Sequence, residues 1–172
     1  MRYLVDDHDL DEATALALYR TIIRWVAQRA DHIEISIQRQ VYDDPTAVAD
    51  LLELGEITGG AASQAFGRSL QSTQRRGTSD SVRVSGAPNA RFVSALTERA
   101  APRRAVSGDL SPVEDIVLSR HGRVLYELYD YGRTQMLDLD DDELADLRQT
   151  LKRAALNPAA VVVAPPYVTD ER

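Results

Sequence analysis

The last third of the chain carries the pattern that most constrains its fold. Between Asp115 and Leu156, three short runs of strand-forming residues lead directly into a stretch with helical periodicity. Connections short enough for hairpins separate the runs, which cover 116–118, 124–129 and 136–139. The stretch that follows repeats leucine at helical spacing, so that one face of a helix carries Leu144, Leu147 and Leu151. We therefore expect a C-terminal three-strand antiparallel meander followed by a helix.

The first forty residues predict a helix and a half-buried strand. Apolar residues recur at helical spacing from about residue 10 to 30, and Asp9 stands where an N-cap is expected, with Glu12 completing a capping box. Residues 33–38 alternate between isoleucine and polar residues, which is typical of a strand with one buried face. Together with the meander, these elements predict an α+β fold, a mainly antiparallel sheet with helices on one face.

Length and composition favour one domain. We expect residues 1–156 to form a single α+β domain and residues 157–172 to form a C-terminal extension. Within the domain, the segment near 55–86 is rich in glycine, serine and arginine and poor in large apolar residues. This composition predicts a mobile segment, because little apolar area is available to hold it in place.

Charge and cysteine content restrict the classes of function. The chain has no cysteine, which excludes disulfides, thiol nucleophiles and cysteine-based metal sites. The first residues do not resemble a secretory signal, and no apolar run is long enough to span a membrane. We therefore expect a cytoplasmic protein with no membrane association. The net charge of −7 argues against a general nucleic-acid binder.

The charge is nevertheless unevenly distributed. Residues 68–104 contain eight arginines and two acidic residues, so this stretch is basic within an acidic chain. Two arginine pairs are candidate binding residues, because guanidinium groups recognise phosphates and carboxylates: Arg75, Arg76, Arg103 and Arg104. These pairs permit contact with a protein partner, with nucleic acid or with the acidic remainder of the same chain.

No catalytic or metal-binding motif is recognisable in the sequence. The three histidines, His8, His32 and His121, belong to separate predicted elements, so a hydrolytic site would have to be assembled by the fold. The acidic groups at 6–9 and 138–142 stand at predicted helix starts, where carboxylates cap the backbone. We expect no metal site and no cofactor, and whether an active site forms in the fold stays open.

The second strand of the meander suggests a binding surface. In a regular strand, Tyr126 shares one face with Val124 and Leu128, whereas Tyr129 and Tyr131 share the other with Leu125. Both faces would then be partly apolar, and helices covering one would leave the other to a partner. Tyr129, Tyr131 and Leu125 are therefore candidate binding residues.

These observations favour a non-catalytic protein-interaction module, such as an adaptor, an inhibitor or a subunit of a complex. Its partner would be another protein or a second copy of the chain in a homo-oligomer. One alternative is a small hydrolase whose acids and histidine converge in the fold. A further alternative is a nucleic-acid-associated accessory protein that acts through the arginine-rich middle segment.

Overall fold

The C-terminal meander forms as the sequence predicts. The computed structural model describes residues 1–38, 51–58, 81–99, 113–129 and 134–165. Strands β5 (Val113–Arg120), β6 (Arg123–Tyr129) and β7 (Thr134–Asp138) pair antiparallel, and helix α4 (Asp141–Arg153) follows. The β5–β6 turn has positive φ angles of 52° at His121 and 78° at Gly122. These angles fit a type I′ turn, whose twist matches that of the two strands.

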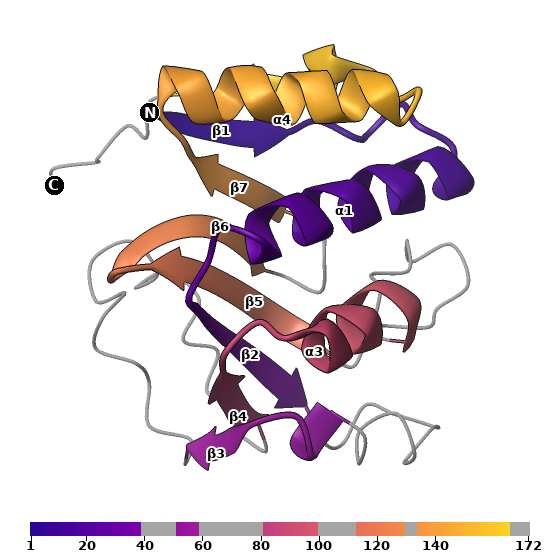
Figure 1. Ribbon diagram of the computed structural model, residues 1–172. Coiled ribbons are helices and arrows are strands. Elements are labelled where there is room, and N and C mark those ends of the chain that lie inside the picture. Colours follow the sequence, from indigo (N-terminus) through magenta and orange to yellow (C-terminus); the bar gives the residue numbers. More distant parts are fainter. Residues whose placement is uncertain (39–50, 59–80, 100–112, 130–133, 166–172) are drawn as a thin grey trace, which may run out of the picture.

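The meander is part of a larger sheet in which every neighbouring pair of strands is antiparallel. The sheet has eight strands in the order β3-β4-β2-β5-β6-β7-β1-β8. The remaining five strands are β1 (Arg2–Val5), β2 (His32–Gln38), β3 (Glu56–Thr58), β4 (Ser81–Gly86) and β8 (Val161–Val163). Strand β1 from the N-terminal end and strand β8 from the C-terminal part of the chain pair with each other at one edge of the sheet (Figure 1).

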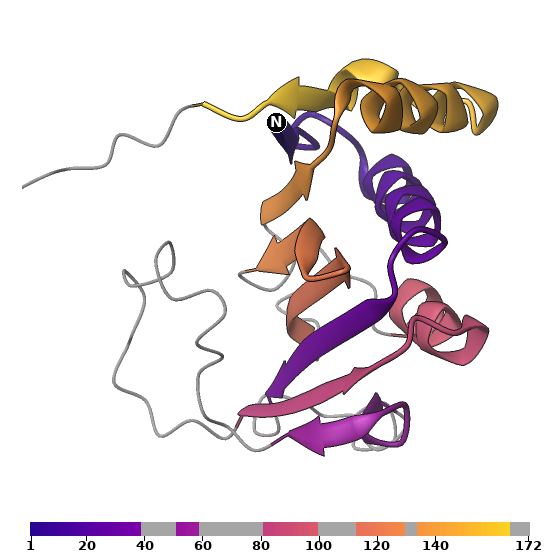
Figure 2. The same cartoon turned by 60° about the vertical axis from the view of Figure 1, so that its left-hand side comes forward.

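All three labelled helices lie on the same face of the sheet (Figures 1 and 2). They are α1 (Glu12–Ala27), α3 (Ala90–Ser94), which continues as a π-helix over Ala95–Arg99, and α4. The prediction of an α+β fold with helices on one face is therefore confirmed.

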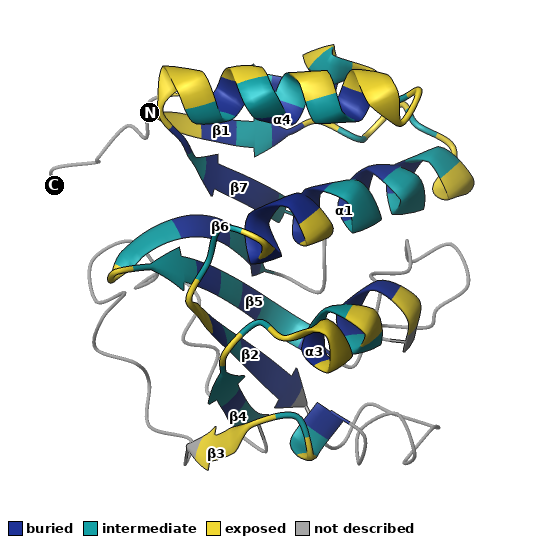
Figure 3. Ribbon diagram, viewed as in Figure 1, coloured by how far each residue is buried: buried dark blue, intermediate teal, exposed yellow. Residues whose placement is uncertain are grey.

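The core lies between the helices and this face of the sheet (Figure 3). Alternate residues of β2, Ile33, Ile35 and Ile37, are fully buried, as the alternating pattern predicts. Helix α1 contributes its apolar stripe, including Ile22 and Ile23, both of which are fully buried. The burial of these side chains is the main contribution to the stability of the fold.

Polar contacts connect α4 to the C-terminal end of α1. The indole Nε1 of Trp25 on α1 donates a hydrogen bond to Asp146 Oδ2 at 2.8 Å, and Arg29 forms an ion pair with the same carboxylate. The Arg29 guanidinium also lies 3.9 Å from the centre of the Trp25 ring, in cation–π contact. These contacts set the position of α1 against α4.

The N-terminus of α4 is joined to the β5–β6 hairpin. Asp140 and Glu143 form the predicted capping box, in which each side chain accepts from the other residue's backbone N–H. Glu143 also accepts from Arg120 at 2.7 Å and from Arg123 at 3.1 Å. The carboxylate of Glu143 is therefore compensated by two guanidinium groups.

The structure corrects the predicted start of α1. The N-cap is Asp11 and not Asp9, because Asp11 Oδ1 accepts from the backbone N–H of Thr14 at 2.9 Å and Oδ2 accepts from its hydroxyl at 2.7 Å. These hydrogen bonds from Thr14 lower the pKa of Asp11. The two-residue difference arises because two aspartates near this position could serve as caps, and only one has the matching threonine.

Two further segments of the chain contribute strands to the sheet. Residues 161–163, which follow the last helix, form β8 and pair with β1. The two ends of the segment near 55–86 are the strands β3 and β4, which pair with each other. The prediction of mobility for residues 59–80 lies outside the described residues.

None of the helices in the described part of the chain is long and apolar enough to cross a membrane.

The packing of α4 gives a direct test of the fold. Leu147 is fully buried on its inner face. Replacement by alanine should lower the free energy of unfolding by roughly 2–5 kcal/mol, because it removes buried methyl groups and leaves a cavity. Chemical denaturation would measure this, with the exposed Gln149→Ala as a control expected to change stability by less than about 0.5 kcal/mol. Equal effects of the two substitutions would contradict the assigned orientation of α4.

Candidate interaction surface on the open face of the sheet

The face of the sheet opposite the helices is the candidate site, and we call it the open face. Among the described residues, no helix or strand lies over it (Figure 2). The strand register shows which side chains it carries, because directly opposed residues of neighbouring strands point to the same side. One cross-strand row runs over all eight strands: Glu56, Ser85, Glu34, Val117, Glu127, Met136, Leu4 and Val162.

The row changes character halfway across the sheet. On the side of β2, β3 and β4 it is polar, and Glu34 forms an ion pair with Arg83 at 3.4 Å. From β5 to β8 it is apolar except for Glu127. We call this second part the apolar half, and it comprises Leu4, Val117, Val124, Met136 and Val162 around Glu127.

Glu127 is a partly buried carboxylate at the centre of the apolar half. It stands between Val117 on β5 and Met136 on β7. No hydrogen bond or ion pair joins its carboxylate to another residue in the described ranges. Burial raises the pKa of Glu127, the nearby Arg2 partly opposes this by lowering it, and Asp138 raises it further. Such a carboxylate on an uncovered surface is a candidate for a functional role.

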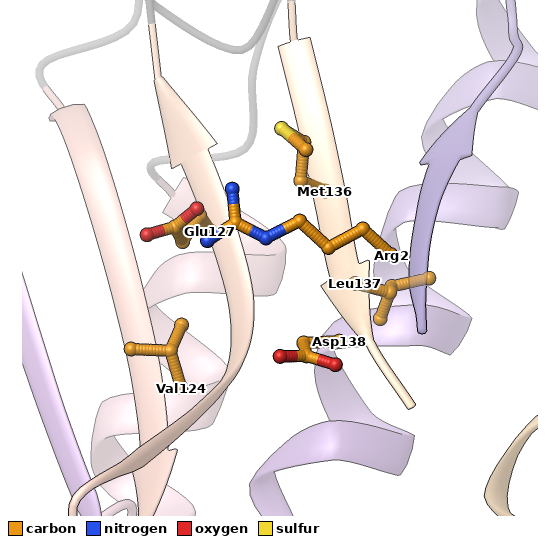
Figure 4. A pocket seen from close by; sticks show the side chains of 6 residues that line it. All are labelled: Arg2, Val124, Glu127, Met136, Leu137 and Asp138. Atoms are coloured by element: carbon orange, nitrogen blue, oxygen red, sulfur yellow. The ribbon is translucent and has the colours of Figure 1, made fainter. Parts of the chain in front are cut away.

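A shallow hollow lies beside Glu127. It encloses about 240 Å³ of empty space, part of it open to solvent, and is lined by Arg2, Val124, Glu127, Met136, Leu137 and Asp138. Figure 4 shows Arg2 reaching from β1 across β7 toward Glu127. Asp138 forms an ion pair with the N-terminal ammonium group, which lies 3.3 Å from its Oδ1. The hollow is too small and too open to enclose a substrate-sized molecule.

Tyr129 lies on the open face next to the apolar half. Its hydroxyl donates to the sulfur of Met136 at 3.1 Å, and only 4% of Met136 is exposed. Tyr126, by contrast, belongs to the core, where its hydroxyl donates to Gln135 Oε1 at 3.0 Å and burial raises its pKa. The predicted separation of these two tyrosines onto opposite faces agrees with the register.

Leu125 does not share the face of Tyr129, and this prediction is corrected. A β-bulge shifts the β5–β6 register, so that Leu118 faces Tyr126 while Ser119 faces Val124. The extra residue, Leu125, is fully buried in the core, and Val124 lines the hollow on the open face instead. Strict alternation fails at a bulge, and nothing in the sequence marks its position.

The remaining predicted binding residues cannot be placed on either face. Arg75 and Arg76 lie in 59–80, Arg103 and Arg104 in 100–112, and Tyr131 in 130–133, all outside the described residues. Their roles stay predictions.

The fold does bring two histidines near a serine and an aspartate. His32 faces Ser119 across β2 and β5, and Asp31 Oδ2 lies 3.0 Å from His121 Nδ1. The backbone N–H of His121 also donates to Asp31 at 2.9 Å, so this contact holds the hairpin turn against the start of β2. The His121 side chain is 88% exposed, and in the described structure no hydroxyl bonds to it. The contact between Asp31 and His121 therefore stabilises the turn, and it does not have the hydrogen bonds of a catalytic site for acyl transfer.

The described residues contain no group of three or more histidine, aspartate and glutamate side chains that could hold a metal ion. Asp140, from the second acidic run, caps α4, as described above. Comparison with known proteins identifies no relative, because no family model, no curated protein and no solved structure matches this chain.

The raised pKa of Glu127 predicts a specific pH dependence. Because the folded state disfavours the ionised carboxylate, wild type should lose stability relative to Glu127→Gln as the pH rises through this raised pKa. The two proteins should be equally stable well below the unfolded glutamate pKa of about 4.3. Denaturation of dilute samples across this pH range would measure the difference.

A matched control is Glu56→Gln, which removes an exposed carboxylate from the same row. It should show no such divergence with pH. A Glu127→Gln variant that is less stable than wild type at neutral pH would contradict the assigned environment of Glu127.

Proposed function

We propose that the chain is a non-catalytic protein-interaction module, acting as an adaptor, an inhibitor or a subunit of a complex, and that it binds its protein partner with the open face. The observation that carries this proposal is an apolar half-sheet, uncovered by any described element, with a partly compensated carboxylate at its centre. Four aliphatic side chains of this half remain partly exposed, whereas Met136 is buried: Leu4, Val117, Val124 and Val162.

The composition of the apolar half supports a protein partner. Tyr129 is of a residue type enriched where proteins meet, and the aliphatic side chains around it supply apolar area without bulky charge. Charged groups such as Arg2 and Glu127 would set the orientation of the partner. The shallow shape of the hollow agrees with this role.

The two other functions have less support. A hydrolase would need its histidine in a sheltered site, and the contact between His121 and Asp31 is exposed.

Nucleic-acid binding would rest on arginines that lie outside the described residues. On the open face itself, acidic residues outnumber Arg2 and Arg83, which disfavours phosphate: Glu34, Glu56, Asp115, Glu127 and Asp138. A cytoplasmic location remains part of the proposal and rests on the lack of cysteine.

A site-specific photo-crosslinker tests the proposal. A benzophenone amino acid at Val117, in the centre of the open face, should trap a protein partner in cells that make this protein. The same probe at Gln149, exposed on α4, is the control and should give no corresponding adduct. Adducts from Gln149 alone, or none from Val117, would contradict binding through the open face.

A further inference from the structure

We infer that the protein covering the open face is a second copy of this chain, in a twofold dimer where Arg2 of each copy pairs with Glu127 of the other. This inference rests on the proposed function and specifies its partner. It is carried by the self-complementary arrangement of charge and apolar surface in the apolar half.

The first argument is charge. Glu127 and Arg2 carry opposite charges on the same surface, and neither takes part in an ion pair with another described residue. Asp138, the other charged residue of the hollow, is matched by the N-terminal ammonium group of Met1. The hollow and its rim are therefore close to neutral, and a second copy presents the same pair of opposite charges, each only partly compensated by the other. A partner of one dominant charge sign would match only one of them.

The second argument is geometry. Strand β7 lies between β6, which carries Glu127, and β1, which carries Arg2. The Arg2 side chain reaches across β7, which brings its guanidinium to the side of Glu127 (Figure 4). A twofold axis that runs parallel to the two sheets and passes between these two groups exchanges their positions, so each guanidinium faces the other copy's carboxylate.

The third argument is desolvation. Glu127 is already partly removed from water in the single chain, and its own Arg2 compensates for this only in part. A second guanidinium would supply charge-assisted hydrogen bonds to the carboxylate at an interface that also buries Leu4, Val117 and Val162. The apolar side chains supply the burial, and the ion pairs fix the register of the two copies.

Edge-to-edge pairing is a weaker route to a dimer. At the outer strand β8, the carbonyl of Val161 accepts a hydrogen bond from Arg148 Nη2 at 3.1 Å. Strand β8 has only three residues, and Pro165 follows soon after it. Short edges with occupied carbonyls and a nearby proline resist the addition of another strand.

Charge reversal with mixing tests the dimer. Sedimentation velocity of the full chain should show a dimer for wild type. Arg2→Glu and Glu127→Arg should each weaken self-association by about tenfold or more, because each variant opposes like charges across the axis. An equimolar mixture of the two variants should regain the dimer, since positions 2 and 127 then carry opposite charges at both contacts across the axis.

Mixing separates contact between chains from contact within one chain. If Arg2 and Glu127 mattered only within one chain, the mixture would stay as weakly associated as its components. The matched control is Arg24→Glu, exposed on α1 on the helical side of the sheet, which should dimerise like wild type. Circular dichroism and thermal unfolding of every variant would show that each remains folded.

Two results would overturn the inference: a wild type that sediments as a monomer at high concentration, or variants whose mixture does not associate. In either case, photo-crosslinking from Val117 to a different protein would leave the proposed interaction function in place. Absence of both the dimer and any adduct from Val117 would remove the inference and the proposed function together.

Discussion

The packing of all three labelled helices on one face of a single antiparallel sheet is the constraint on which the rest of the structure depends. The three helices pack on the face that carries the buried isoleucines of β2, so one face supplies almost the whole core. A sheet with helices on both faces would bury its strands completely. Here no described helix covers the other face, which has a polar half and an apolar half.

Glu127 has no direct ion pair with a described residue, and this distinguishes it from three other carboxylates near the sheet. Glu143, Asp146 and Glu34 each face at least one arginine within ion-pair distance. Those contacts fix the helices and strands relative to one another. Glu127 has only the more distant influence of Arg2, which does not offset its loss of hydration. In the proposed interaction, a guanidinium group of another molecule would complete the compensation of this carboxylate.

Much of the fold follows from local patterns in the sequence. The meander, the buried isoleucines of β2 and the capping box at Asp140 depend on neighbouring residues, and all agree with the structure. The turn at His121–Gly122 could be read in the same way, because glycine tolerates the positive φ that it requires.

The candidate site is formed by strands that are far apart in the sequence, so local patterns predicted only some of its residues. Tyr129 could be assigned to the open face from alternation, whereas the bulge at Leu125 reversed the sides expected for Leu125 and Val124. Glu127 was missed as a functional residue because its environment comes from Met136 and Arg2 on other strands. The one feature of the sequence that could have pointed to Glu127 is that it is a single glutamate within an apolar strand.

The most direct measurement of the central claim is a concentration series of NMR spectra of the full chain with labelled methyl groups. Association through the open face should shift the resonances of Leu4, Val117 and Met136 as the concentration rises. The methyl groups of Leu147, buried beneath the helices, should stay unchanged. Constant spectra over the whole series, or shifts confined to the helical side, would contradict the assignment of the open face as the interaction surface.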